Sequence, residues 1–203
     1  MTRGAVRHLK RADPALRALI DRVGPCRLTL RTEGTHFDHL ARAIVYQQLA
    51  GKAAAAIHAR LLGLYGNRPP TPTELLATRP AQLRRAGLSR QKIQYLRDLA
   101  GKAVSGAVAL DALDGSPDEQ VIEALTAIKG VGRWTAQMFL MFRLGRPDVL
   151  PVLDYGIGKA MRQAYRLRRM PTPAQMERIA APWRPYRTVA CWYLWRSLDV
   201  IPP

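Results

Sequence analysis

Hydrophobic and polar residues alternate with the period of an α-helix along most of the chain. Over residues 37–49, and again over residues 93–104, apolar residues recur every three or four positions and so fall on one helix face. The only alternation typical of a β-strand, at residues 26–31, is too short and isolated to form a sheet. The pattern therefore predicts an all-α protein.

Helix starts follow a recurring pattern of capping residues. Segments beginning at Thr71, Ser116 and Thr172 each combine a hydroxyl residue, a proline and, three positions on, Glu or Gln, which predicts a capping box. Asp13 precedes a proline in the same style. Clusters of Gly and Pro separate these starts, so we expect about nine or ten short helices, whereas a four-helix bundle has fewer and longer ones.

Residues 120–144 predict two helices joined by a tight turn, followed by an isolated Asp154. The turn contains Gly130 and Gly132, and the second helix, expected over residues 133–144, is apolar nearly all round and therefore buried. Glycines remove side chains from the turn, so N–H groups at the start of the second helix can approach a phosphate. An ordinary pair of antiparallel helices is the alternative; Arg133 and the net charge favour phosphate binding.

The charge of the chain points to a polyanionic partner. Its 203 residues contain 32 Lys and Arg against 15 Asp and Glu, a net charge of +17. Guanidinium groups suit phosphate, and affinity for a nucleic acid should fall steeply with salt. No segment has the amphipathic stripe of a helix that lies on a membrane, so nucleic acid is the preferred interpretation.

Cysteine and histidine usage gives no sign of a metal or disulfide framework. Only two cysteines occur, and His36 and His39, three residues apart, have no further ligand nearby, so we interpret them as a surface face. No run of about 18 apolar residues and no signal-peptide core is present. We expect a soluble, cytoplasmic, monomeric protein in which one core or two small subdomains form.

The motifs, taken in order, resemble the 3-methyladenine DNA glycosylase II branch of the helix-hairpin-helix/GPD superfamily. The matching segments are residues 37–41, 47–54, 87–89, 125–136, 146–151, 154, 183–187 and 192–193. The resemblance covers essentially residues 15–200 and implies a compact form without the β-rich N-terminal domain of some members. It implies two helical subdomains, one of roughly residues 40–145 and one of the N-terminal segment with residues 150–203, with the active site in the cleft between them.

What the resemblance implies about chemistry centres on Asp154. Family members flip a damaged nucleotide out of double-stranded DNA and cleave its N-glycosidic bond, and Asp154 matches the carboxylate that stabilises the sugar cation. From the residues alone, Asp154 is better explained as the N-cap of a helix starting at Tyr155, and both roles are compatible. Asp148 is the rival carboxylate, which we interpret as a loop or capping residue. Leu153 replaces an acidic residue common in the family.

The position two residues after Gly132 separates two chemistries within the family. Bifunctional relatives place there a lysine that attacks the sugar, but this chain has Trp134. Lys129 lies before the turn and is interpreted as a phosphate contact or solvated residue. The expected enzyme is therefore monofunctional and leaves an abasic site. A methylated purine such as 3-methyladenine or 7-methylguanine is cationic, so it leaves without a general acid.

The resemblance also assigns binding residues. The aromatic candidates for stacking on a cationic base are Trp134, Tyr155 and Trp192, while Trp183 and Trp195 are assigned to the core. Leu49, with Gln48, matches the wedge that fills the vacated stack, and a core leucine is the alternative. The phosphate-binding hairpin comprises Gly130, Val131, Gly132, Arg133 and Thr135.

No cofactor is required by this hypothesis. Similar hairpins in the family often bind a monovalent cation, Na⁺ or K⁺, through three carbonyls, here those of Thr126, Ile128 and Val131. Two alternative functions stay open at the level of sequence. One is a non-catalytic helix-hairpin-helix protein that binds DNA, and the other is a glycosylase for deaminated or mismatched neutral bases.

Overall fold

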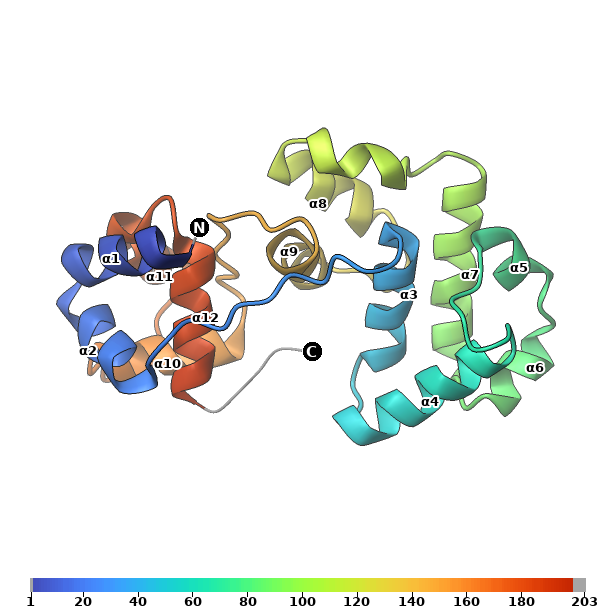
Figure 1. Cartoon of the computed structure of the whole chain (residues 1–203), viewed down its shortest axis with the longest axis horizontal. Helices are drawn as coiled ribbons and strands as arrows, with labels where there is room; N and C mark the ends of the chain where they lie inside the picture. Colours follow the sequence, from blue (N-terminus) through green and yellow to red (C-terminus); the bar gives the residue numbers. More distant parts are fainter. Residues whose placement is uncertain (1, 199–203) are drawn as a thin grey trace. The chain divides into compact units, whose positions relative to one another are not determined.

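The computed structural model describes residues 2–198, and every regular element in this range is helical (Figure 1). The all-α prediction is therefore confirmed. Twelve α-helices and two 3₁₀-helices occur in this range, more than the nine or ten expected. The excess includes helices of only six residues, such as α5 (Pro72–Ala77) and α6 (Pro80–Arg85), which are too short to show a periodic apolar face. None of the helices in this range has the length and hydrophobicity needed to cross a membrane.

The chain divides into two compact units, each described separately below. The terminal unit comprises the residues up to Leu30 and those from Leu140 onward, and the central unit comprises Arg31–Phe139. We expected a division near residues 40 and 145–150. The observed boundary lies within helix α9 (Arg133–Phe142), between Phe139 and Leu140, rather than in the loop that follows it.

The central unit is built around helix α7, which packs against α3, α5 and α6. Its elements are α3 (His36–Tyr46), α4 (Gly51–Gly63), α5, α6, α7 (Arg90–Val104), η1 (Leu110–Gly115), α8 (Asp118–Thr126) and the first part of α9. The inner faces predicted for α3 and α8 are buried, as apolar residues at helical spacing require.

Two of the three predicted capping boxes are confirmed. Thr71 and Thr172 cap α5 and α11 (Pro173–Ala180), each with a reciprocal bond from the residue at N3. The box predicted at Ser116 is not confirmed, because α8 starts after Pro117, which is its N-cap and offers no side-chain cap. The Ser116 hydroxyl donates to the Ala112 carbonyl of η1 at 3.0 Å.

His36 does not lie on the surface, contrary to our expectation. Its side chain is buried, with Nε2 3.0 Å from the Asp114 carboxylate and its ring edge-on to Phe139. His36 is the first residue of α3, where its ring turns into the core of the central unit. Within residues 2–198, no group of three or more His, Cys, Asp or Glu side chains could hold a metal ion.

The terminal unit is built around helix α12, which is buried on all sides. Its elements are α1 (Thr2–Ala12), α2 (Pro14–Val23), α10 (Tyr155–Ala164), α11, η2 (Ala181–Trp183) and α12 (Arg187–Ser197). Figure 1 shows α12 in red among these helices, and it packs against α1, α2 and α10. Nine consecutive residues, Arg187 through Trp195, are buried, so this helix has no polar face.

Asp13 ties three elements of the terminal unit together. Its Oδ1 accepts the N–H groups of Ala15 (2.8 Å) and Leu16 (3.0 Å), as the N-cap of α2. Its Oδ2 accepts the Tyr165 hydroxyl at 2.5 Å and the Trp183 indole N–H at 2.9 Å. Burial, reinforced by the Asp13 carboxylate, raises the pKa of Tyr165, so this hydroxyl remains a proton donor to Asp13.

We expect Asp13→Ala to destabilise the protein by about 3 kcal/mol or more, because it removes a helix cap and leaves two buried donors without their acceptor. Thermal unfolding followed by circular dichroism measures this loss. Asp21→Ala is the matched control, since Asp21 is half exposed and pairs only with Lys10; its cost should stay within about 1 kcal/mol. Equal melting temperatures for the two variants would contradict this role of Asp13.

Candidate functional site

Asp154 ends the loop that follows α9 and caps the N-terminus of α10. Its side chain is partly buried, and Oδ1 accepts two donors, the Ile157 N–H at 2.7 Å and the Trp195 indole N–H at 3.0 Å. The interpretation of Asp154 as an N-cap is thus confirmed. Both donors hold the Asp154 side chain in one orientation.

Two exposed apolar side chains flank this carboxylate. Leu153 is 70% exposed and Tyr155 is 73% exposed, the two most exposed large hydrophobic residues among those described. Large apolar side chains that stay in water at neighbouring positions are typical of a surface that binds a ligand. The carboxylate therefore lies between two side chains that can contact an apolar or aromatic group.

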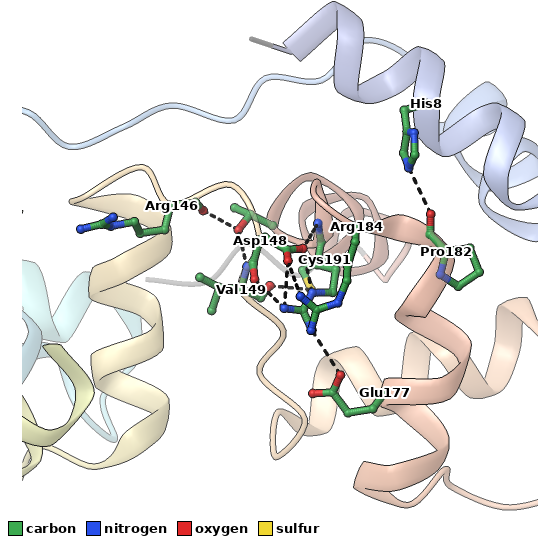
Figure 2. Close-up of polar contacts among 10 residues, drawn as sticks. His8, Arg146, Asp148, Val149, Glu177, Pro182, Arg184 and Cys191 are labelled. Atoms are coloured by element: carbon green, nitrogen blue, oxygen red, sulfur yellow. Dashed lines mark hydrogen bonds and ion pairs between the residues drawn. The ribbon is translucent and has the colours of Figure 1, made fainter. Parts of the chain in front are cut away.

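The loop before Asp154 is hydrogen-bonded to the first turn of α12. The Thr188 hydroxyl donates to the Arg146 carbonyl at 2.6 Å and accepts the Val149 N–H at 3.1 Å, and the Thr188 N–H donates to the Pro147 carbonyl at 2.9 Å. The Cys191 thiol, one turn further on, lies 3.8 Å from the Val149 carbonyl (Figure 2). These contacts fix the path of residues 146–149.

Asp148 is the central anion of an ion-pair cluster that is only partly buried, rather than a simple loop or capping residue. Its Oδ1 accepts from Arg187 Nε at 2.7 Å, and its Oδ2 accepts from Arg184 Nη1 at 3.0 Å. The Glu177 Oε2 atom lies 3.2 Å from Arg187 Nη1 (Figure 2). The Arg187 side chain is only 10% exposed, so its charge needs these partners. Asp148 is therefore engaged in ion pairs that hold the loop. Asp154 remains as the candidate for a catalytic carboxylate.

Helix α12 carries the aromatic residues Trp192, Tyr193 and Trp195. Trp192 is 9% exposed and stacks edge-on against Tyr193, with ring centroids 5.0 Å apart. Trp195, assigned to the core from the sequence, is buried as expected but also bonds to Asp154. Sequence spacing gave no signal for this contact, because 41 residues separate the two side chains. Tyr155 and Trp192 thus belong to the same unit as Asp154, and Trp134 is a partly buried residue of the central unit.

The glycine turn of the central unit is held by α7 and by Gln47. The Asp98 carboxylate accepts the Lys129 N–H at 2.8 Å, and Gln47 donates to the Gly130 carbonyl at 2.8 Å. Gly130 has φ +81°, and a Cβ there would lie 2.1 Å from the Tyr95 ring. Tyr95 and the backbone conformation therefore also require glycine at this position, a reason that the sequence did not show.

Gly132 differs from Gly130 in its surroundings. A Cβ at Gly132 would meet no atom within 4 Å, and the residue is exposed at the start of α9. The first N–H groups of a helix lack acceptors within that helix. Gly132 therefore leaves open the space in which an anion would approach the N-terminus of α9, where Thr135 lies in the first turn.

Arg133 is engaged by a carboxylate. Its two terminal nitrogens donate to Glu119 of α8 at 3.0 and 2.6 Å, and these hydrogen bonds raise the pKa of the guanidinium. Both side chains are exposed, by 48% and 74%, and such pairs contribute about 1 kcal/mol or less. A phosphate that approached Arg133 would therefore have to compete with Glu119.

The predicted wedge lies in the turn between α3 and α4. Gln48 has the unusual φ of +56° for a residue with a side chain, and Leu49 beside it is 38% exposed. A leucine of the core would be buried, so that alternative is excluded. The left-handed conformation of Gln48 places strain at a surface turn, as is common at binding sites.

Positive charge is distributed unequally between the units. Over residues 1–30 and 140–202 the sequence has 18 Lys and Arg against six Asp and Glu, whereas the central unit has 14 against nine. The unit that contains Asp154 therefore carries an excess of 12 positive charges out of 17. This unit therefore attracts a strongly anionic partner more than the central unit does.

Comparison with known proteins identifies the family of the chain. Residues 41–185 match the family described as HhH-GPD superfamily base excision DNA repair protein. DNA-3-methyladenine glycosylase 1 of Schizosaccharomyces pombe is 36% identical over 193 residues, which cover 94% of this chain and 85% of that protein.

Solved structures give the same result. The S. pombe 3-methyladenine DNA glycosylase (Mag1) in complex with abasic DNA superposes with a TM-score of 0.86 at 34% identity, covering 97% of each chain. A DNA-3-methyladenine glycosidase from Bacillus halodurans gives a TM-score of 0.85 at 38% identity, covering 95% of this chain and 88% of that one. These similarities confirm the resemblance that the hairpin and Asp154 motifs indicated. The chain belongs to the HhH-GPD superfamily of base excision DNA repair proteins.

Proposed function

We propose that the protein is a monofunctional DNA glycosylase that removes alkylated purines, of the 3-methyladenine or 7-methylguanine type, from double-stranded DNA. One observation carries the proposal: the Asp154 carboxylate is oriented by two donors between exposed Leu153 and Tyr155, in the more basic unit. The names of the relatives, both 3-methyladenine glycosylases, support this substrate class. In this proposal the chain acts as a monomer.

The chemistry asked of Asp154 is electrostatic. When the N-glycosidic bond breaks, its electron pair leaves with the base and the sugar becomes an oxocarbenium-like cation. A fixed carboxylate stabilises that cation, and it can orient the water that then adds to the sugar carbon and loses a proton. An N-methylated purine is already cationic, so it departs as a neutral base and needs no general acid.

Aromatic rings supply the recognition of such a base. An aromatic face attracts a cation by about 0.5–2 kcal/mol, and more where water is excluded. Tyr155 presents an exposed ring next to Asp154, and Trp192 lies on the helix that contacts Asp154. Trp134 of the central unit completes the set of proposed stacking residues.

The central unit is proposed to hold the DNA. The N–H groups at the start of α9 bind a backbone phosphate through the open space at Gly132, while Leu49 and Gln48 enter the stack that the flipped base vacates. In this proposal a Na⁺ or K⁺ ion would be held by the carbonyls of Thr126, Ile128 and Val131. The Ile128 carbonyl accepts the Val131 N–H at 3.0 Å, and its second lone pair suits a cation.

Asp154→Asn should release methylated purines at least about 100-fold more slowly than the wild type, because the neutral amide cannot stabilise the sugar cation. Asn is as good an N-cap as Asp, so folding and DNA affinity should be retained. The measurement is single-turnover cleavage of single-lesion duplexes after alkali. A wild-type protein that binds DNA but releases no base would favour the non-catalytic alternative, and faster release of hypoxanthine or uracil would favour the neutral-base alternative.

Borohydride should trap no covalent adduct between the protein and a lesion-containing duplex, because Trp134 offers no amine to form a Schiff base. Strand scission should appear only after alkali treatment. Gel electrophoresis under denaturing conditions separates the two outcomes. A trapped adduct, or scission without alkali, would show that another amine of the chain performs the lyase reaction and would refute the monofunctional assignment.

Gly132→Ala should weaken binding to duplex DNA by about tenfold, since the added methyl group occupies the proposed path of the phosphate to the N–H donors of α9. Its melting temperature should not change, because no atom lies within 4 Å of the new Cβ. Gly130→Ala is the matched comparison and should instead lower the melting temperature through its clash with Tyr95. Unaltered DNA affinity of Gly132→Ala would argue against phosphate binding at this turn.

A further inference from the structure

We propose that Trp195 is a positioning residue for the catalytic carboxylate of Asp154. In this proposal α12 also holds in place the loop that ends at Asp154. The inference rests on the proposed function, in which Asp154 stabilises the sugar cation. Trp195 would act through Asp154 and not on the DNA itself. Three observations within the terminal unit support it.

The first observation is the direction of the Trp195 indole. Its side chain is 2% exposed, and Nε1, the only polar atom of the ring, donates to Asp154 Oδ1 at 3.0 Å. The ring also packs against Phe142, with centroids 6.0 Å apart. Because Trp195 lies on a helix buried on all sides, the indole has little freedom and the position of its N–H is fixed by the core.

The second observation is the space that Gly156 leaves for this contact. A Cβ at Gly156 would lie 3.1 Å from Asp154 Oδ1 and 3.3 Å and 3.4 Å from Trp195 Cδ1 and Nε1. Gly156 has no positive φ that would itself require glycine. The absence of a side chain in the first turn of α10 therefore lets the indole and the carboxylate approach each other.

The third observation is that the same helix holds the other end of the loop. Thr188 bonds the main chain of residues 146–149, and Arg187 pairs with Asp148 (Figure 2). Arg187 and Trp195 are eight residues apart, or about 12 Å along a helix. The loop from Arg146 to Asp154 is thus fastened near both ends to one rigid element.

Two donors on one oxygen restrain the carboxylate more than one does. The Ile157 N–H alone would allow the carboxylate to turn about that hydrogen bond, whereas the added Trp195 N–H fixes the plane of the group. A charge that must face a developing cation loses effect when it is displaced, and a shift of about 1 Å can cost about 100-fold in rate. The Trp195 bond therefore matters for the rate of bond cleavage rather than for DNA binding.

Trp195→Phe tests this, because it removes the donor and keeps an aromatic ring in the core. We expect the single-turnover rate of base release to fall about tenfold or more, with DNA affinity unchanged. Trp183→Phe is the matched control: Trp183 is equally buried and its indole N–H also donates to a carboxylate, that of Asp13. It should lose comparable stability and keep the wild-type rate at a temperature where both variants are folded.

The preference for a cationic sugar analogue gives a readout that a structural role would not change. A displaced carboxylate stabilises a nearby cation less. Trp195→Phe should therefore lose part of the wild-type preference for a duplex with a protonated pyrrolidine over one with a neutral tetrahydrofuran in place of one deoxyribose, whereas Trp183→Phe should keep it. Gly156→Ala, which crowds the same contact, should reduce this preference in the same way, and it provides the test if Trp195→Phe does not fold.

The outcomes separate this inference from the proposed function. If the wild type releases no base, the proposed function fails and the inference fails with it. If the wild type is active and Asp154→Asn is not, but Trp195→Phe matches Trp183→Phe in both rate and preference for the cationic analogue, only the positioning role is overturned. A slower rate with a reduced preference for the cationic analogue in Trp195→Phe, and not in Trp183→Phe, supports it.

Discussion

The burial of α12 on all sides is the constraint on which the terminal unit depends. A helix without a solvent-facing side must satisfy each of its polar side chains inside the protein, because an unpaired buried donor costs about 1–3 kcal/mol. Arg187 and Thr188 find their partners in residues 146–149, and Trp195 finds its partner in Asp154. Among the described residues no buried side-chain nitrogen or oxygen lacks a hydrogen bond. The packing that buries α12 therefore also fixes the position of the Asp154 carboxylate.

In the central unit, contacts with neighbouring side chains fix the glycine turn before α9. Its glycine turn is fixed by Tyr95 and Asp98 of α7 and by Gln47, so the N-terminus of α9 points in a defined direction without help from a ligand. Gly132 then leaves that terminus accessible. In the proposed reaction, the central unit supplies backbone donors for phosphate, and the terminal unit supplies charge and a fixed carboxylate for the sugar.

Local features of this fold could be predicted from the sequence, whereas contacts between distant residues could not. Helical periodicity and capping residues such as Asp13 and Thr71 act within a few positions, and they gave the fold class, several helix starts and the N-cap role of Asp154. The bond from Trp195 to Asp154 spans 41 residues, and a tryptophan in an apolar helix gives no sign of its partner. His36 shows the same limit, because its neighbours in the sequence indicated a surface position, whereas its ring is buried against Phe139, far along the chain.

The central claim is that Asp154 opposes a positive charge on the sugar, and binding of a cationic sugar analogue tests it most directly. Duplexes that carry a protonated pyrrolidine in place of one deoxyribose can be compared with duplexes that carry a neutral tetrahydrofuran at the same position. The account predicts that the wild type binds the charged duplex about 100-fold or more tightly than the neutral one, and that Asp154→Asn loses this preference. Equal affinity of the wild-type protein for the two duplexes would contradict it.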